Sequence, residues 1–319
     1  MADLAVPSIS PARRGLRDAL RVSRNPVVLK ELRGRMRGAR AFLLLTFHLL
    51  AMSGFVLLLH TLYQASANNS PYTTFTAPLL GKYLFGGLVI IELMLACFIT
   101  PAITAGAISG ERERQTYDLL RTTLLPARSI ILGKLASALV FILLLLLAGL
   151  PLQNLSFLLG GVAPEEVLIA SALLIATAFL FGAAGLFFSS FMRRTLGATV
   201  LSYAFALLST LGLPLLLLPL LGLGPVLNFG TPRLLVQILL TYGFGLLVAL
   251  NPLATAMATE IILVNQHSTF YFTQTLYSPS GRSIVIPLIS PWLPYVLFCF
   301  GLGALLILFS IWKVQRVER

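Results

Sequence analysis

Six long stretches of this sequence are almost free of charged residues, and they constrain the fold more than any other feature. A helix needs about 20 mostly apolar residues to cross the hydrocarbon core of a bilayer. The stretches lie at 41–62, 83–108, 130–150, 166–191, 197–219 and 291–312. Of the 319 residues, 57% are hydrophobic and only 11% are charged, whereas a soluble domain carries about 25% charged residues. The composition therefore excludes a water-soluble globule and predicts an all-α integral membrane protein with six transmembrane helices.

The basic residues are distributed unevenly between the connections. The formal net charge is +12, from 23 Lys and Arg against 11 Asp and Glu. Twenty of the 23 lie before the first span, in the segment 109–134, between spans four and five, or after the last span. Connections rich in Lys and Arg stay on the cytoplasmic side of a membrane. We therefore expect a multi-pass protein of a bacterial plasma membrane with both termini in the cytoplasm, and no nucleic-acid partner.

The N-terminal arm, 12–40, is predicted to contain a helix that lies along the membrane surface. Asn25 suits an N-cap, and Pro26 suits the first helical position. From there, apolar side chains fall on one face at helical spacing and basic ones on another. The basic face is formed by Lys30, Arg33 and Arg37. Such a helix places its apolar face at the acyl boundary and its basic face near anionic head groups, so membrane lipids are expected partners.

The region 222–290 is the hardest part of the chain to assign. It contains an apolar stretch, 234–265, which Asn251-Pro252 divides into two helices. The second helix is short for a full crossing and contains Glu260. Irregular backbone at membrane depth is tolerated only where protein buries it or where it lines a wet cavity. We therefore favour an external region with a re-entrant helical hairpin, while two further crossing helices stay open as an alternative.

These features together predict a single transmembrane domain over 1–319. Its parts are the cytoplasmic arm at 12–40, spans one to five within 41–219, the external region at 222–290, the sixth span at 291–312 and a cytoplasmic tail at 313–319. In the fourth span, small residues recur at spacings of three and four: Ala178, Gly182, Gly185 and Ser189. Such a face lets helix backbones approach closely, which favours packing within the chain over a subunit interface.

The connection between spans two and three combines both signs of charge within a few residues. Glu111, Arg112, Glu113 and Arg114 are consecutive. We expect a short helix over 110–126 that Pro126 ends before the third span. Its apolar contacts would be Thr116, Leu119 and Leu120. A compact helix held between two membrane helices is suited to passing movement from a soluble partner into the membrane.

Glu92 is an ionisable residue inside the second span, with no Lys or Arg close in sequence. A lone carboxylate at that depth costs on the order of several kcal/mol unless it is protonated, paired or hydrated. Two interpretations stay open. Glu92 either faces a translocation path, or it is a protonated carboxyl that hydrogen-bonds to a neighbouring helix.

The sequence lacks the motifs of two common kinds of catalysis. A Walker A loop needs G-x-x-x-x-G-K-[ST] to wrap phosphates, but the Gly-Lys pairs at 81–82 and 133–134 are followed by neither Ser nor Thr. There is also no H-E-x-x-H zinc motif. We therefore expect no enzymatic activity, no catalytic residues and no cofactor or metal ion in this chain.

Three segments resemble those of one membrane protein family. The sequence ISGERERQTYDLL, residues 108–120, with Gly133-Lys134 downstream, resembles the connection between spans two and three of ABC-2 type transporter permeases. Residues 25–33 are similar to the connecting helix that opens those permeases, and 251–253 to a pattern that precedes their last span. With the six spans, the resemblance covers nearly the whole chain. Gln115 departs from it, because the family commonly has glycine there.

The resemblance implies the permease subunit of an ATP-driven ABC transporter, and export as the direction of transport. ATP and Mg²⁺ would bind to two copies of a separate ATP-binding subunit, and a second permease subunit, identical or homologous, would complete a dimer. Coupling to the ATP-binding subunit would fall on Glu111, Arg112, Glu113, Arg114, Thr116, Leu119 and Leu120. An ATP-independent secondary transporter or channel, and a non-transporting membrane scaffold subunit, stay open as alternatives.

Overall fold

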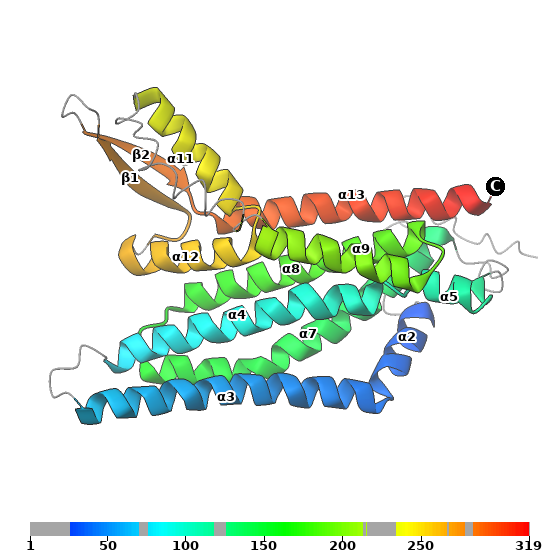
Figure 1. Ribbon diagram of the computed structural model, residues 1–319, viewed down its shortest axis with the longest axis horizontal. Helices are drawn as coiled ribbons and strands as arrows, with labels where there is room; N and C mark the ends of the chain where they lie inside the picture. The colour runs from blue at the N-terminus through cyan, green and yellow to red at the C-terminus, as the bar shows by residue number, and fades with distance from the viewer. Residues whose placement is uncertain are drawn as a thin grey trace, which may run out of the picture.

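The computed structural model describes residues 26–69, 76–117, 126–212, 215, 234–266, 268–277 and 283–318. Most of these residues belong to long helices that run side by side (Figure 1). Within the described part of the chain, six helices are long and apolar enough to cross a membrane, and one bent helix pair adds at most a seventh span. The architecture is that of a multi-pass, all-α membrane protein.

The six candidate spans follow the apolar stretches of the sequence. They are α3 (Ala39–Asn69), α4 (Ala77–Thr104), α7 (Ala127–Leu159), α8 (Pro164–Phe191), α9 (Thr195–Leu207) with the π-helical turn η2 (Leu208–Gly212), and α13 (Trp292–Glu318). Each of the six predicted spans corresponds to one of these helices. The predicted end of the fifth, at 219, lies outside the described residues.

The centre of the bundle is formed by α4, α7 and α8. Between 56% and 67% of the most apolar stretches of these helices are buried, against 11% for α3. Large apolar side chains such as Phe42, Phe47 and Leu50 are exposed along α3. A contiguous apolar surface of this kind indicates lipid rather than water as the surrounding solvent.

The small residues of α8 pack within the chain, as predicted. A Cβ atom at Gly185 would collide with the side chain of Thr104 in α4. One at Gly182 would lie 3.2 Å from the side chains of Leu135 and Thr100. The stripe therefore allows α8 to approach α4 and α7 closely.

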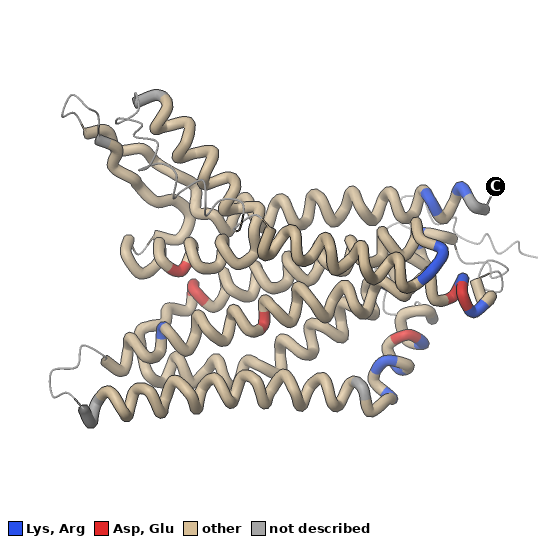
Figure 2. Tube along the Cα trace, in the orientation of Figure 1, with Lys and Arg blue, Asp and Glu red and all other residues tan. Residues whose placement is uncertain are grey.

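Charged residues gather at one end of the bundle. The first helix, α2 (Pro26–Met36), lies at this end with the short helix α5 (Ser109–Glu113) and the C-terminal end of α13 (Figure 1). Figure 2 shows most of the described Lys and Arg residues there. The helix connections that are rich in Lys and Arg in the sequence thus lie together at one end of the bundle.

The bent pair consists of α11 (Leu234–Val248) and α12 (Pro252–Gln266). The helix direction changes by 117° between them. After α12, β1 (Tyr271–Tyr277) and β2 (Ser283–Ile289) form an antiparallel hairpin, with Tyr271 opposite Ile289. The hairpin was not predicted. It projects with α11 from the end of the bundle away from α2 (Figure 1).

Asn251 fixes the bend that the sequence predicted at Asn251-Pro252. Its Oδ1 accepts a hydrogen bond from Ala254 N at 2.8 Å, which caps α12, while Pro252 occupies the first helical position. Its Nδ2 donates to the carbonyl oxygens of Ser209 and Thr210 in η2, at 2.6 and 2.8 Å. One buried side chain thus satisfies backbone groups at two helix ends.

Candidate functional site

The connection after α4 is an elbow, which we define as residues 105–117. Its helix, α5, ends at Glu113, and Gln115 has a φ of 58°. That value lies in the left-handed region, which a right-handed helix cannot include. The helix predicted over 110–126 is therefore interrupted at Gln115. Residues 118–125 lie outside the described residues.

Lys134 of α7 holds the elbow through a buried ion-pair cluster. Its side chain is 2% exposed, and Nζ donates to Glu31 Oε1 of α2 at 2.9 Å and to Glu111 Oε1 of α5 at 2.6 Å. Arg35 Nη2 lies 3.9 Å from the second carboxylate oxygen of Glu31. A buried ammonium requires such partners, because an unpaired charge there is strongly unfavourable. The cluster therefore connects α2, α5 and α7.

The charge state of Glu31 is set by this cluster. Burial alone would raise the pKa of its carboxyl group. Lys134, through its charge and hydrogen bond, and then Arg35 together hold that pKa below its ordinary value. Glu31 is consequently ionised at neutral pH and pairs with Lys134 as a carboxylate.

Arg112 connects the elbow to the C-terminal end of α8. Its Nη1 donates to the carbonyl oxygens of Ser190 and Met192, at 2.9 and 3.2 Å. The guanidinium also lies over the ring of Tyr117, 5.1 Å from the centroid. Cations near a helix C-terminus interact favourably with the carbonyl groups exposed there.

Glu113 connects the elbow to the start of α9. Its Oε1 accepts a hydrogen bond from Thr195 N at 2.8 Å, and its Oε2 accepts one from Thr195 Oγ1 at 2.7 Å. A carboxylate is stabilised at a helix N-terminus because free N–H groups and the positive end of the helix dipole lie there.

Ser189 of α8 anchors the first residues of the elbow. Its Oγ accepts hydrogen bonds from Ile108 N and Ser109 N, at 2.9 and 3.0 Å. Both Ser189 and Ser109 are fully buried. The serine predicted as a small packing residue thus also supplies the acceptor for two buried backbone donors.

The predicted coupling residues fall into three groups. Glu111, Arg112 and Glu113 bond to the chain's own helices, whereas Arg114 and Thr116 are exposed. Leu119 and Leu120 lie outside the described residues. The pairing of Lys134 with Glu31 and Glu111 was not predicted from the sequence. A lysine within an apolar span was the signal that could have indicated it.

The helix predicted from Pro26 is present as α2. Lys30, Arg33 and Arg37 are exposed, while Val27 is buried. Asn25, predicted as its cap, lies outside the described residues.

Glu92 is a residue of α4, and its side chain faces α7 and is 1% exposed. Its Oε2 accepts a hydrogen bond from Gln153 Nε2 at 2.8 Å. Gly149 leaves the space for its other oxygen, since a Cβ there would collide with Oε1. This geometry agrees with a carboxyl group that hydrogen-bonds to a neighbouring helix. A place in a translocation path stays a prediction.

Comparison with protein-family models finds none that matches this sequence, and comparison with curated proteins finds no significant match.

Proposed function

We propose that this chain is the permease subunit of an ATP-driven transporter of the ABC-2 type, and that it works as an exporter. The observation that carries the proposal is the bonding of the elbow. It is bonded directly to α7, α8 and α9, and through Lys134 to α2. Such a short segment is able to move four helices at once when its tip is displaced.

The exposed tip is the surface we assign to a soluble ATP-binding subunit. It consists of Arg114, Gln115 and Thr116, and Leu119 and Leu120 would extend it. Two copies of that subunit would hold ATP and Mg²⁺ and close on each other. The side chains of Glu111, Arg112 and Glu113 would then pass the displacement into the spans, because charge-assisted hydrogen bonds hold them in fixed geometry.

Gln115 stands where ABC-2 permeases commonly have glycine, and its backbone conformation is one that glycine adopts easily. This conformation supports the resemblance. Glycine enters the left-handed region at little steric cost. A family that uses this elbow would therefore favour glycine at this position, as the permeases do. Glutamine keeps the same backbone conformation here, with a φ of 58°.

The arrangement in the membrane follows from the same proposal. We place the elbow, α2 and both termini in the cytoplasm of a bacterial cell, with Lys30, Arg33 and Arg37 of α2 near the lipid head groups. We assign α11 and α12 to a re-entrant hairpin that enters from the external side. Its support is the 117° bend and the 15-residue length of α12, which is short of the roughly 20 residues of a full crossing. A second permease subunit would complete the transporter.

The proposal is tested by co-expressing the chain with an ATP-binding subunit encoded beside its gene. We expect the two to co-purify and the complex to hydrolyse ATP. Thr116→Trp should weaken the association, since it adds bulk at the exposed tip. Arg37→Gln is the matched control, because it changes an exposed residue at the same end of the bundle outside the elbow.

Failure to co-purify with any such subunit, or an unchanged association in Thr116→Trp, would contradict the proposal. Transport by the chain alone, without ATP, would favour a secondary transporter or channel instead.

A further inference from the structure

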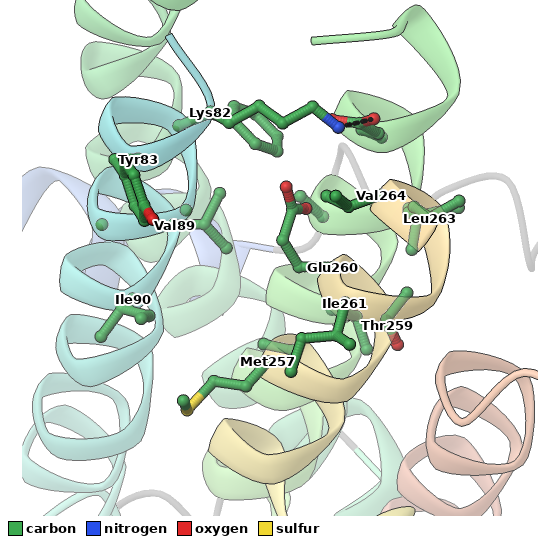
Figure 3. A pocket seen from close by; sticks show the side chains of 18 of the residues that line it. Lys82, Tyr83, Val89, Ile90, Met257, Thr259, Glu260, Ile261, Leu263 and Val264 are labelled. Carbon is green, nitrogen blue, oxygen red and sulfur yellow. Dashed lines mark ion pairs between the residues drawn. The ribbon is translucent and has the colours of Figure 1, made fainter. Parts of the chain in front are cut away.

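A cavity of about 710 Å³ lies between α3, α4, α8 and α12 (Figure 3). Its size is within the range of small-molecule sites, about 300–1,000 Å³. Most of its lining is apolar, including Phe85, Val89, Ile169 and Leu263. It lies near the starts of α4 and α8, at the end of the bundle away from the elbow.

One lysine and two glutamate side chains line this cavity. Lys82 Nζ lies 3.6 Å from Glu166 Oε1, and the carboxyl group of Glu260 on α12 points into the space towards Lys82 (Figure 3). Two carboxyl groups therefore face one ammonium group. When all three are ionised, this part of the cavity carries an excess negative charge.

The carboxyl groups are also short of hydrogen-bond donors. Glu166 is 6% exposed, and its Oε2 accepts no hydrogen bond from the described residues. The same holds for Glu260 Oε1. Buried acceptors without donors are unfavourable, so a ligand that supplies donors gains binding free energy here.

The rim of the cavity indicates how a ligand would reach it. Tyr83, Met257 and Ile261 line the cavity and are each more than half exposed, at 54%, 55% and 57%. The opening therefore faces the outside of the helix bundle, where lipid chains would surround the protein. Lys82 and Glu166 lie near the starts of α4 and α8, and the apolar walls continue deeper (Figure 3).

We propose that this cavity binds an amphiphile with a primary or secondary ammonium group and an apolar body. The ammonium would donate hydrogen bonds to Glu260 and Glu166, and the apolar body would lie along Val89 and Ile169. The assignment does not rest on coupling to an ATP-binding subunit, because no residue of the elbow lines the cavity. Binding is measurable on the chain alone, so the two proposals can fail independently.

The test uses the full chain purified in dodecyl maltoside, a detergent that carries no ammonium group. Dansylcadaverine is the probe, because it joins an apolar fluorophore to a primary ammonium. Its emission should rise and shift to shorter wavelength on binding. The N-acetylated compound, which keeps the apolar body and loses the charge, should bind at least about tenfold more weakly.

Substitutions in the cavity test whether the probe binds there. Glu260→Gln should weaken binding about tenfold, since it removes a charge-assisted hydrogen bond. Glu165→Gln is the matched control, because Glu165 is exposed on the same turn as Glu166 and does not line the cavity. Gly86→Leu should abolish binding by filling the cavity. A Cβ at Gly86 meets no other atom within 4 Å, and leucine is the better helix former, so the helix tolerates the change.

Competition identifies the natural source of the ammonium group. Displacement of the probe by phosphatidylethanolamine assigns the site to a lipid head group, and retention of the probe assigns it to a non-lipid amine. Equal binding of the acetylated compound would overturn the proposal. An unchanged affinity in both Glu260→Gln and Gly86→Leu would overturn it as well.

Discussion

Each end of the bundle contains a lysine in an apolar helix, but the two lysines differ in how their charge is paired. At the elbow, Lys134 has two carboxylate partners, Glu31 at 2.9 Å and Glu111 at 2.6 Å, and Arg35, 3.9 Å from Glu31, supplies the second positive charge. At the cavity, Lys82 has one partner at 3.6 Å and faces a second carboxyl group. The first cluster is balanced, whereas the second has an excess of acid. A balanced cluster fixes helices relative to each other, and an unbalanced one leaves binding capacity for a ligand.

The strongest test of this comparison is to remove each lysine in turn. Lys134→Met leaves Glu31 and Glu111 without their shared cation, and should lower the free energy of unfolding by about 3–5 kcal/mol. Lys82→Met should cost less, about 1 kcal/mol, because its ion pair is longer and the side chain is 21% exposed. Thermal unfolding of the purified variants measures both.

A double variant, Glu111→Gln and Lys134→Met, serves as the control. It removes one charge of each sign, leaves Glu31 paired with Arg35, and should recover much of the lost stability. Equal losses in Lys134→Met and Lys82→Met would show that the two ends do not differ in the way described.

Ser189→Ala tests the anchoring of the elbow without changing any charge. It leaves the N–H groups of Ile108 and Ser109 buried without an acceptor, and should cost about 1–3 kcal/mol. The control is Ser190→Ala. The Ser190 hydroxyl is equally buried, but among the described residues it bonds only to Phe187 O within its own helix, so its loss should be smaller. Unfolding in denaturant compares the two, and a larger loss in Ser190→Ala would contradict the anchoring role.

Gln115→Gly should raise stability slightly, by about 0.5–1 kcal/mol, since the left-handed backbone is strained for residues other than glycine. Gln115→Val should lower it, because a β-branched side chain fits that region worst. The same unfolding measurement checks both signs. A higher stability of Gln115→Val would contradict the left-handed backbone conformation at this position.

The smallest effect is expected from the titration of Glu31. Its pKa is lowered from an ordinary value of 4.5, so its stabilising contribution is complete above that pH. The contribution is lost as the pH falls below 4.5 through the lowered pKa, when the carboxylate becomes protonated. Melting curves recorded across this range should show a larger fall for the wild type than for Glu31→Gln. An equal fall in stability for the wild type and Glu31→Gln would show that Glu31 does not cause the loss of stability at low pH.

The sequence predicted the features that depend on local pattern. The spans follow from the length of the apolar stretches, α2 from Pro26 and the break in the external region from Asn251-Pro252. Lys134 within an apolar span indicates that buried partners exist, but the partners themselves could not be identified, because the contacts of the elbow join residues distant in sequence. Lys134 is 103 positions from Glu31 and 23 from Glu111. No periodicity specifies such pairs.

The hairpin of β1 and β2 was missed for a different reason. Each strand has only seven residues, and Pro287 lies inside the second. A proline within an apolar run argues against a strand unless the strand lies at a sheet edge. In a two-stranded sheet both strands are edges, so Pro287 is accommodated.

The bonds at the two ends of α9 have a mechanical consequence. At its start, Thr195 bonds to Glu113 of the elbow, and η2 at its other end bonds to Asn251 at the bend before α12. We infer that α9 transmits movement along its length, so that a tilt at the elbow would displace the bend between α11 and α12. Spin labels at exposed positions on α9 and α12 should keep a constant separation while both move relative to α3. The elbow and the bend would then move together through α9, without a chain of side-chain rearrangements through the core.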